Sequence, residues 1–212
     1  MRRALVLLAA TAALAAPAVA QQAMQKFGSK DPAAVTGGTY TVDPRHTLVE
    51  WEVDHFGFSP YFGLFGQATG TLQLDPKNPA AAKLDVTIPV AKVVTALPAL
   101  TEHLLRPAAA GGKPDFFGAN PADARFVSTA VVPGPENTAK VTGNLTLNGV
   151  TKPLTLEVEF YGAGKTPAAM GGKENVGFEA EATIKRSDFG IVFALPLVSD
   201  DVELDIAAAF QK

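Results

Sequence analysis

The stretch Leu154-Thr155-Leu156-Glu157-Val158-Glu159-Phe160 alternates strictly between apolar and polar side chains. Successive side chains of a β-strand point to opposite faces, so this alternation predicts a strand with one apolar face and one face in water. The same pattern recurs in the stretches 49–55, 84–88, 178–184 and 202–206. These stretches together indicate a sheet that covers an apolar interior on one side only.

Eight segments of this type follow one another from Tyr40 to the C-terminus, and only one short helix is expected among them. A sheet that no layer of helices covers must pack its apolar face against a second sheet or close upon itself. We therefore expect an all-β fold with hairpin turns such as Asn148-Gly149 between antiparallel neighbours. The aromatic-rich residues 56–63 are expected to form a turn. The predicted strands span residues 40–55, with a break at Asp43-Pro44, and residues 64–74, 82–94, 126–132, 140–147, 153–161, 175–186 and 201–210.

The longest connection between predicted strands spans residues 95–125. Within it, Leu97, Leu100 and Leu104 recur at helical spacing, which predicts a short helix over residues 98–106 with a proline in its first turn. A small-residue segment then leads to Asp115-Phe116-Phe117. Loops of this length in a compact domain usually serve as lids or binding loops, so we expect this one to cover a site.

The N-terminus has the pattern of a signal peptide over residues 1–20, with cleavage near Ala20. A transmembrane anchor is the alternative, but the apolar run is shorter than the ~20 residues that cross a bilayer. We therefore expect an exported protein that does not span a membrane. Residues 21–38 lack periodicity and are expected to form a flexible N-terminal segment before a single domain over residues 39–212.

Composition excludes several classes of function. The chain has no cysteine, so thiol nucleophiles, cysteine metal sites and disulfides are impossible. Removing residues 1–20 takes away Arg2 and Arg3 and leaves 16 basic and 21 acidic side chains, a net charge of −5. An acidic chain without a basic cluster is not expected to bind nucleic acid or an anionic membrane.

The three histidines do not form a metal-binding pattern. His46 and His55 are nine residues apart on one predicted strand, which separates them by roughly 30 Å. A histidine at the rim of a barrel more commonly donates a hydrogen bond to the backbone or to a ligand head group. Motifs for nucleophilic catalysis and phosphate binding are also absent. We therefore predict no metal, no cofactor and no catalytic residue.

Several motifs resemble those of the YceI-like family in order and spacing. The most specific is Gly143-x-Leu145-Thr146-Leu147-x-Gly149-Val150-Thr151-Lys152-Pro153. The resemblance extends from Tyr40 to the C-terminus. It has one departure, since residues 107–114 look like an insertion before Asp115. The other matching motifs are Tyr40-x-Val42-Asp43-Pro44-x-His46-Thr47-x-Val49-x-Trp51-x-Val53-x-His55, Gly63-x-Phe65, Thr95 with His103-Leu104, Asp115-Phe116-Phe117, Phe126-x-Ser128-Thr129 and Arg186-x-Asp188-Phe189-Gly190.

The resemblance implies a lipocalin-like, eight-stranded antiparallel barrel whose pore holds a long polyisoprenoid or a related lipid such as a fatty-acyl chain. It also implies a periplasmic location and a possible homodimer. A barrel of eight strands can be filled by side chains or can hold one small ligand, and 13 Phe beside a single Trp favour a lined pore. The predicted ligand-binding residues are Val49, Trp51, Val53, His55, Phe58, Phe62, Phe65, His103, Leu104, Phe116, Phe117, Phe126, Arg186 and Phe189.

Arg186 has two interpretations. Strict alternation places it on the inward face after Ile184, where a buried guanidinium needs a partner. One possible partner is the carboxylate of Asp188 or Asp200. The other is a polar or phosphate head group at the mouth of the pore, because a guanidinium binds oxyanions through two parallel hydrogen bonds.

Three classes of function remain. The first is a soluble exported carrier or storage protein for an isoprenoid or fatty-acyl chain, and the second is an enzyme of lipid or isoprenoid conversion on the same scaffold. The second lacks a recognisable acid/base pair in the sequence. The third, an outer-membrane barrel, turns its apolar side chains outward, and would then pack carboxylates such as Glu157 and Glu181 into a narrow pore.

Overall fold

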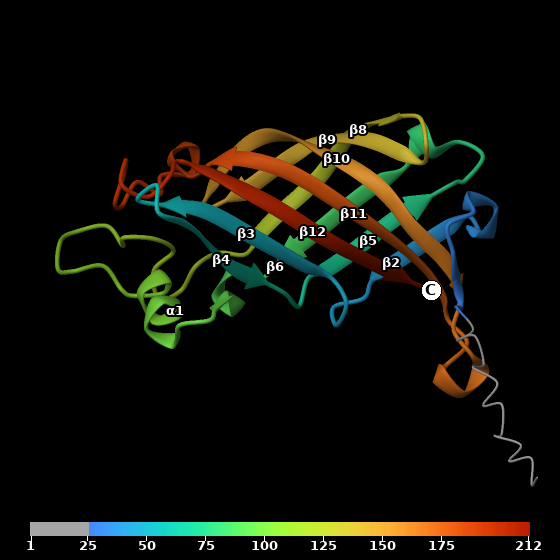
Figure 1. Ribbon diagram of the computed structural model, residues 1–212, viewed down its shortest axis with the longest axis horizontal. Helices are drawn as coiled ribbons and strands as arrows, with labels where there is room; N and C mark the ends of the chain where they lie inside the picture. Colours follow the sequence, from blue (N-terminus) through green and yellow to red (C-terminus); the bar gives the residue numbers. More distant parts are fainter. Residues whose placement is uncertain (1–25) are drawn as a thin grey trace, which may run out of the picture.

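The computed structural model describes residues 26–212, which form a closed antiparallel barrel with one α-helix at one end (Figure 1). The barrel strands are β2 (Gly38–Val42), β3 (Leu48–His55), β4 (Ser59–Phe65), β5 (Thr69–Leu74), β6 (Lys83–Ile88), β8 (Ala124–Pro133), β9 (Thr138–Leu147), β10 (Val150–Lys165), β11 (Glu174–Lys185) and β12 (Asp201–Gln211). Because β2 with β3 and β4 with β5 each act as one interrupted strand, the barrel is eight-stranded, as predicted.

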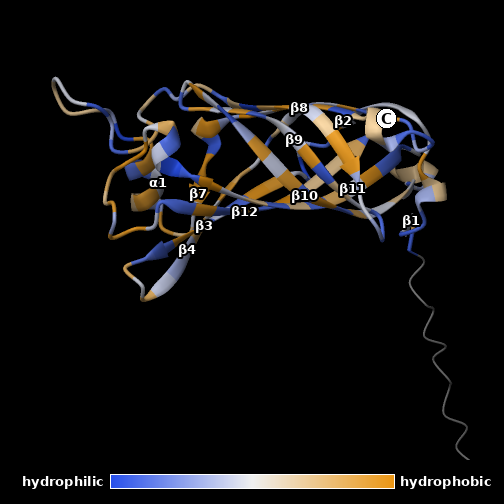
Figure 2. Cartoon of the chain, turned by 90° about the horizontal axis from the view of Figure 1, so that it is seen from above, coloured by the Kyte–Doolittle hydropathy of each residue, from blue (hydrophilic) through white to orange (hydrophobic). Residues whose placement is uncertain are grey.

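The barrel closes at β12. This strand pairs with β11 on one side and with both β3 and β2 on the other. The pairing then runs through β5, β6, β8, β9 and β10 back to β11, with antiparallel neighbours throughout. The closed ladder leaves few free edges, and the strands show alternating hydrophobic and hydrophilic residues along their length (Figure 2).

The alternating stretches point their apolar side chains inward. On β10, Leu156 and Phe160 are buried in the core, whereas Glu157 and Glu159 are exposed on the outer face. The outward carboxylates are partly neutralised by lysines, as in the pair between Lys140 Nζ and Glu157 Oε1 at 2.6 Å. The interior is therefore apolar and the exterior charged.

One predicted strand is interrupted, and one predicted turn was wrong. The predicted strand 64–74 is interrupted between β4 and β5, where Gln67 has a φ of 58°. The predicted turn 56–63 is mostly strand β4, because the hairpin needs only Phe56 and Gly57, with φ of 61° and 68°. Pro60 is tolerated in β4 because on its far edge this strand pairs only with β7 (Val94–Thr95), through Gly63 and Leu64.

Other element boundaries also differ from the sequence prediction. The predicted strand 82–94 ends at Ile88, because Pro89 cannot donate to the ladder, and a 3-10 helix (Val90–Lys92) and β7 follow. The helix α1 (Pro98–Leu104) is present with Pro98 in its first turn and is two residues shorter than predicted. Asn148 and Gly149 form the β9–β10 turn with positive φ, as predicted.

The described part of the segment 21–38, which was predicted to be flexible, contains two short elements. The strand β1 (Gly28–Ser29) pairs with Gly164 and Ala163 of β10, and a 3-10 helix (Pro32–Ala34) follows, capped by the side chain of Asp31. Backbone pairing and helix capping hold this segment, and neither produces a periodic hydrophobic pattern that the sequence could reveal. The predicted signal peptide, residues 1–20, lies outside the described residues.

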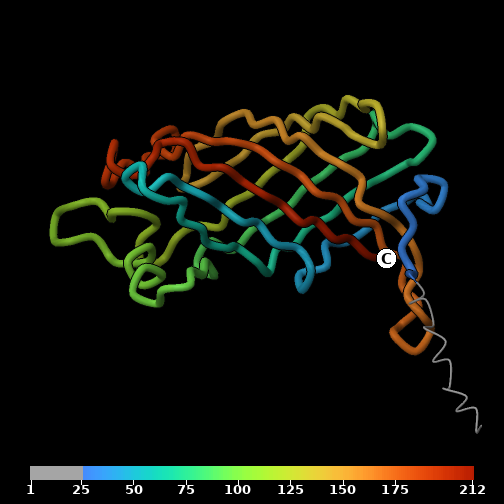
Figure 3. Tube along the Cα trace, viewed as in Figure 1, coloured from blue at the N-terminus to red at the C-terminus, as the bar shows by residue number. Residues whose placement is uncertain are grey.

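The two ends of the barrel differ. The connection that contains α1 and the connection that contains residues 190–199 lie at one end, which we call the loop end (Figure 3). The C-terminus and the segment before β2 lie at the other, which we call the C-terminal end (Figure 1). In the described part of the chain, no helix has the length and hydropathy to cross a membrane.

Candidate ligand cavity

The interior of the barrel holds two neighbouring cavities. The larger, about 710 Å³, lies at the loop end between the strands, α1 and residues 191–198, and we call it the loop-end chamber. The smaller, about 210 Å³, lies toward the C-terminal end and is lined by β12 residues up to Phe210; we call it the C-terminal chamber. Cavities that bind small molecules commonly measure about 300–1,000 Å³, so the loop-end chamber has the size of a binding site.

Strand β3 supplies one wall of the loop-end chamber. Its inward residues Val49, Trp51, Val53 and His55 all line this chamber, as their shared face predicts. Phe65 of β4 lies beside them, opposite Val49 in the ladder. Five of the predicted ligand-binding residues therefore meet on one wall.

The helix α1 and the loop after it line another part of the loop-end chamber. His103, Leu104, Phe116 and Phe117 all line it. The His103 ring packs edge-on against Phe116 at 5.2 Å between centroids, and its Nε2 is 2.8 Å from Oδ2 of Asp115. Phe117 donates its backbone N–H to the carbonyl of Leu104 at 3.0 Å. The Asp115-Phe116-Phe117 segment is thus tied directly to α1.

Residues 107–114, which the sequence marked as an insertion, do not interrupt these contacts. All of them are exposed. They leave the barrel as a protruding loop between α1 and Asp115 (Figure 3). The insertion therefore lengthens the loop without adding to the described cavity wall.

Arg186 lines the loop-end chamber, but neither of the predicted carboxylates binds it. Its guanidinium, in a residue only 5% exposed, donates hydrogen bonds to the carbonyls of Phe193 at 2.7 Å, Ser199 at 2.8 Å and Val198 at 2.9 Å. Burial lowers the pKa of Arg186, and the charge of Asp200 opposes this shift. The alternation placed Arg186 inward correctly, but its partners are carbonyls that only the folded loop brings together.

The two carboxylates have other partners. Asp200 accepts hydrogen bonds from the backbone N–H of Ser187 at 2.9 Å and from its hydroxyl at 2.8 Å. Asp188 lies 3.6 Å from Lys152 Nζ at the surface. The predicted Arg186 ion pair is therefore wrong, because carbonyls of residues 191–199 occupy the donors of the guanidinium.

Three predicted ligand-binding residues lie outside both chambers and one lies in the second. Phe58 is 89% exposed at the β3–β4 hairpin, and Phe62 is 47% exposed on the outer face opposite Glu52. Phe189 is 2% exposed inside the core, and its carbonyl accepts a hydrogen bond from Asn148. Phe126 lines the C-terminal chamber. Both Phe58 and Phe62 fall in the stretch 56–63, which was predicted as a turn, so the sequence assigned them no strand face.

The sequence prediction missed several wall residues. Val202 and Leu204 of β12 line the loop-end chamber, and the alternation of their strand was sufficient to place them there. Tyr61 was missed because its strand was predicted as a turn. Phe193 lies in a segment without periodicity, and its ring contacts His103 and Phe116 at 5.3 and 5.4 Å between centroids.

The chambers differ in polarity. Among the described residues that line the loop-end chamber, His55, His103 and Arg186 are the side chains that can carry a charge. The described lining of the C-terminal chamber has no charged side chain and only Thr47 as a polar one. Trp51 Nε1 and Tyr61 Oη, on the loop-end wall, are buried without a hydrogen-bond partner. Within the described residues, no cluster of three or more His, Asp or Glu could hold a metal ion.

Comparisons with known proteins agree on one family. The model of the YceI-like domain matches residues 40–210. Protein YceI of Escherichia coli O17:K52:H18 is 41% identical over 171 residues, which cover 79% of this chain and 84% of that protein.

Solved structures share the barrel. BcnA of Burkholderia cenocepacia superposes with a TM-score of 0.64 at 25% identity, covering 79% of this chain and 98% of that one. A polyisoprenoid binding domain from Saccharophagus degradans, implicated in plant cell wall breakdown, gives a TM-score of 0.57 at 13% identity and covers 81% and 97% of the two chains. The second likeness is one of fold alone.

Proposed function

Since the chain belongs to the YceI-like family, we propose that it is an exported lipid-binding protein that holds a long isoprenoid chain in the bore of its barrel, for transport or storage. A related fatty-acyl chain is the alternative ligand. The observation that carries this proposal is the pair of apolar cavities, which lie end to end inside one closed barrel.

The shape of the cavities suits a long apolar chain. Each methylene group moved out of water contributes about 0.8 kcal/mol, so a chain that lies along both chambers gains free energy with its length. The charged and polar groups His55, His103 and Arg186 are confined to the loop-end chamber, which suits a polar head group near that end. The Saccharophagus degradans domain, which has the same fold, is described as polyisoprenoid-binding and supports this ligand class.

We propose binding without chemical conversion. Arg186 is held by loop carbonyls, and His103 is held by Asp115 and two phenylalanine rings, so each has a structural use. An enzyme of isoprenoid or lipid conversion on the same scaffold is the alternative from the sequence. The two differ in what the protein releases, because a carrier returns its ligand unchanged.

The location and assembly belong to the same proposal. Export to the periplasm rests on the signal-peptide pattern of residues 1–20, and N-terminal sequencing of the protein isolated from its host is the test. We expect a start at Gln21. A protein that still begins at Met1 would overturn both the cleavage and the periplasmic location. The homodimer is tested by the mass of the native assembly.

The decisive experiment identifies the ligand. Protein purified from its own host is analysed by native mass spectrometry, and the bound species is extracted and identified. We expect a long-chain isoprenoid or fatty-acyl lipid in about one copy per barrel, since an eight-stranded barrel holds one small ligand. An empty barrel that also fails to bind added long-chain isoprenoids would overturn the proposal.

A further inference from the structure

The two chambers meet at a ring of four aliphatic side chains. Val49 of β3, Ile88 of β6, Leu145 of β9 and Leu204 of β12 line both chambers. These strands are spread around the barrel, so the four side chains approach the bore from different sides. We call this ring the waist.

An aromatic ring lies beside the waist in each chamber, and each ring lies against a glycine. Trp51, opposite Leu204 in the ladder, covers Gly63, where a Cβ atom would lie 2.2 Å from Trp51 Cζ2. Phe126, opposite Leu145, covers Gly143, where a Cβ atom would lie 2.4 Å from Phe126 Cζ. A side chain at either glycine would therefore displace the ring. Both glycines let a large ring lie flat on the wall.

We propose that the width of the waist sets the longest chain that the barrel accepts, so that the waist acts as a ruler for chain length. Gly63 and Gly143 keep the waist wide enough for a chain to pass. A short tail occupies the loop-end chamber alone, and a longer tail passes the waist and fills the C-terminal chamber as well. The direction follows from polarity, because the polar groups line the loop-end chamber and the C-terminal chamber is lined almost entirely by apolar side chains. This inference rests on the proposed function and adds the residues that select the ligand.

The test narrows the waist without changing the ends of the barrel. Leu204→Phe places a larger ring in the bore, and Leu204→Met is the matched control because it conserves volume. Binding of all-trans prenyl alcohols that increase by one isoprene unit is followed through Trp51, the single Trp of the chain, in protein freed of co-purified lipid. Circular dichroism verifies the β fold of each variant.

In the wild type and in Leu204→Met, affinity should rise about fourfold for each added methylene until the bore is full. In Leu204→Phe, short alcohols should bind as in the wild type. Affinity should then stop rising once the loop-end chamber is full, so that the longest alcohols bind more than about tenfold more weakly than to the wild type. Gly63→Ala, which displaces the Trp51 ring, should show the same plateau and carries the test if Leu204→Phe does not fold.

The outcomes separate the two claims. If affinity rises with chain length equally in the wild type, Leu204→Phe and Gly63→Ala, the waist is not a ruler, and the proposed function stays intact. An equal loss of affinity at every chain length would also overturn the ruler, because the waist would then control ligand entry or folding and not chain length. A wild-type protein that binds none of the alcohols would overturn the proposed function itself.

Discussion

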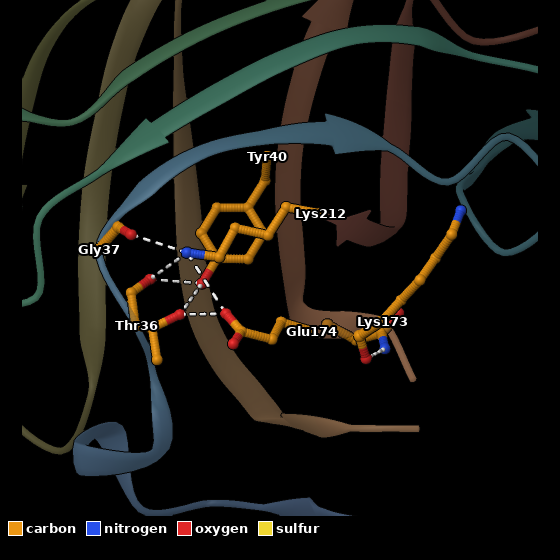
Figure 4. A network of polar contacts seen from close by, with 7 residues as sticks. Thr36, Gly37, Tyr40, Lys173, Glu174 and Lys212 are labelled. Atoms are coloured by element: carbon orange, nitrogen blue, oxygen red, sulfur yellow. Dashed lines mark hydrogen bonds and ion pairs between the residues drawn. The ribbon is translucent and has the colours of Figure 1, made fainter. Parts of the chain in front are cut away.

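The two ends of the barrel are closed by different chemistry. At the C-terminal end, the ring of Tyr40 is 1% exposed and belongs to the apolar core, and polar groups contact its hydroxyl and one face of its ring. Its hydroxyl donates to the carbonyl of Thr36, and Lys212 Nζ lies 4.6 Å from the centre of its ring. Lys212 also donates to the carbonyl of Gly37 at 2.7 Å and pairs with Glu174 at 3.3 Å (Figure 4). The first described segment and the last residue are thus joined across the end of the barrel.

At the loop end, aromatic side chains join α1, the segment after it and residues 191–199, beside the hydrogen bonds of Arg186 to loop carbonyls. His103, Phe116 and Phe193 pack edge to face with each other at 5.2–5.4 Å between centroids. Such contacts contribute about 0.5–1.5 kcal/mol each beyond the area that they bury. Side-chain contacts between loops can separate without breaking a strand ladder, whereas the C-terminal network is anchored on β2, β11 and β12. We therefore propose that the ligand expected from the proposed function enters at the loop end.

The largest expected effect comes from breaking the C-terminal end. Tyr40→Ala should lower the free energy of unfolding by about 3–5 kcal/mol, because it removes a buried ring from the core and a partner of Lys212. Denaturant unfolding measures the loss. The matched control is Phe58→Ala, which removes an exposed ring and should change stability by less than about 0.5 kcal/mol. Equal effects of the two variants would contradict this account of the C-terminal end.

At the loop end, Arg186→Met should also lower the free energy of unfolding. The carbonyls of Phe193, Val198 and Ser199 lose their donor, and a buried carbonyl without a partner costs about 1–3 kcal/mol. We expect a total loss of about 2–4 kcal/mol, since some of these carbonyls will reach water. Arg125→Met is the control, because Arg125 makes a surface ion pair with Asp85 and its loss should have little effect. A head-group role for Arg186 alone would instead leave the stability of the ligand-free protein unchanged.

Replacing Phe116 and Phe117 by Ala tests the side wall of the loop-end chamber. The double variant should weaken binding of a long-chain isoprenoid by about 1–4 kcal/mol through lost contact area. Some stability should also be lost, since both rings pack against the core around Trp51 and Leu104. Binding is titrated through Trp51 fluorescence at every chain length, with circular dichroism as the fold control.

The matched double variant is Phe58→Ala with Phe62→Ala. It removes the same side chains from positions outside both chambers, and we expect unchanged affinity. Equal affinity of the Phe116/Phe117 variant and the wild type at every chain length would show that these rings do not contact the ligand.

The smallest expected effect is a change of stability with pH. A hydrogen bond from Thr36 and the neighbouring Lys212 lower the pKa of Glu174. A carboxyl group with a lowered pKa in the folded state stabilises it above its unfolded pKa, and this contribution is lost as pH falls through the folded pKa. The stability difference between wild type and Glu174→Gln should therefore be present at neutral pH and disappear below about pH 4.5. A difference that persists in stronger acid would exclude the charge of Glu174 as its source.

The sequence by itself determined the faces of the strands. Alternation placed Val49, Trp51, Val53 and His55 on one wall, and Asn148-Gly149 marked a hairpin turn. These features are local, because a strand repeats every two residues and a turn depends on the backbone preferences of its own residues. The family motifs were sufficient to predict the closed eight-stranded barrel.

Only the tertiary structure decided where distant groups meet. It brought Asp115 to His103, the carbonyls of residues 191–199 to Arg186, and Lys212 to the segment before β2. It also placed Val49, Ile88, Leu145 and Leu204 around one bore. These contacts join residues from different strands and loops, and their geometry depends on how the barrel closes. A pattern along the chain records which way a side chain points but not what lies opposite it.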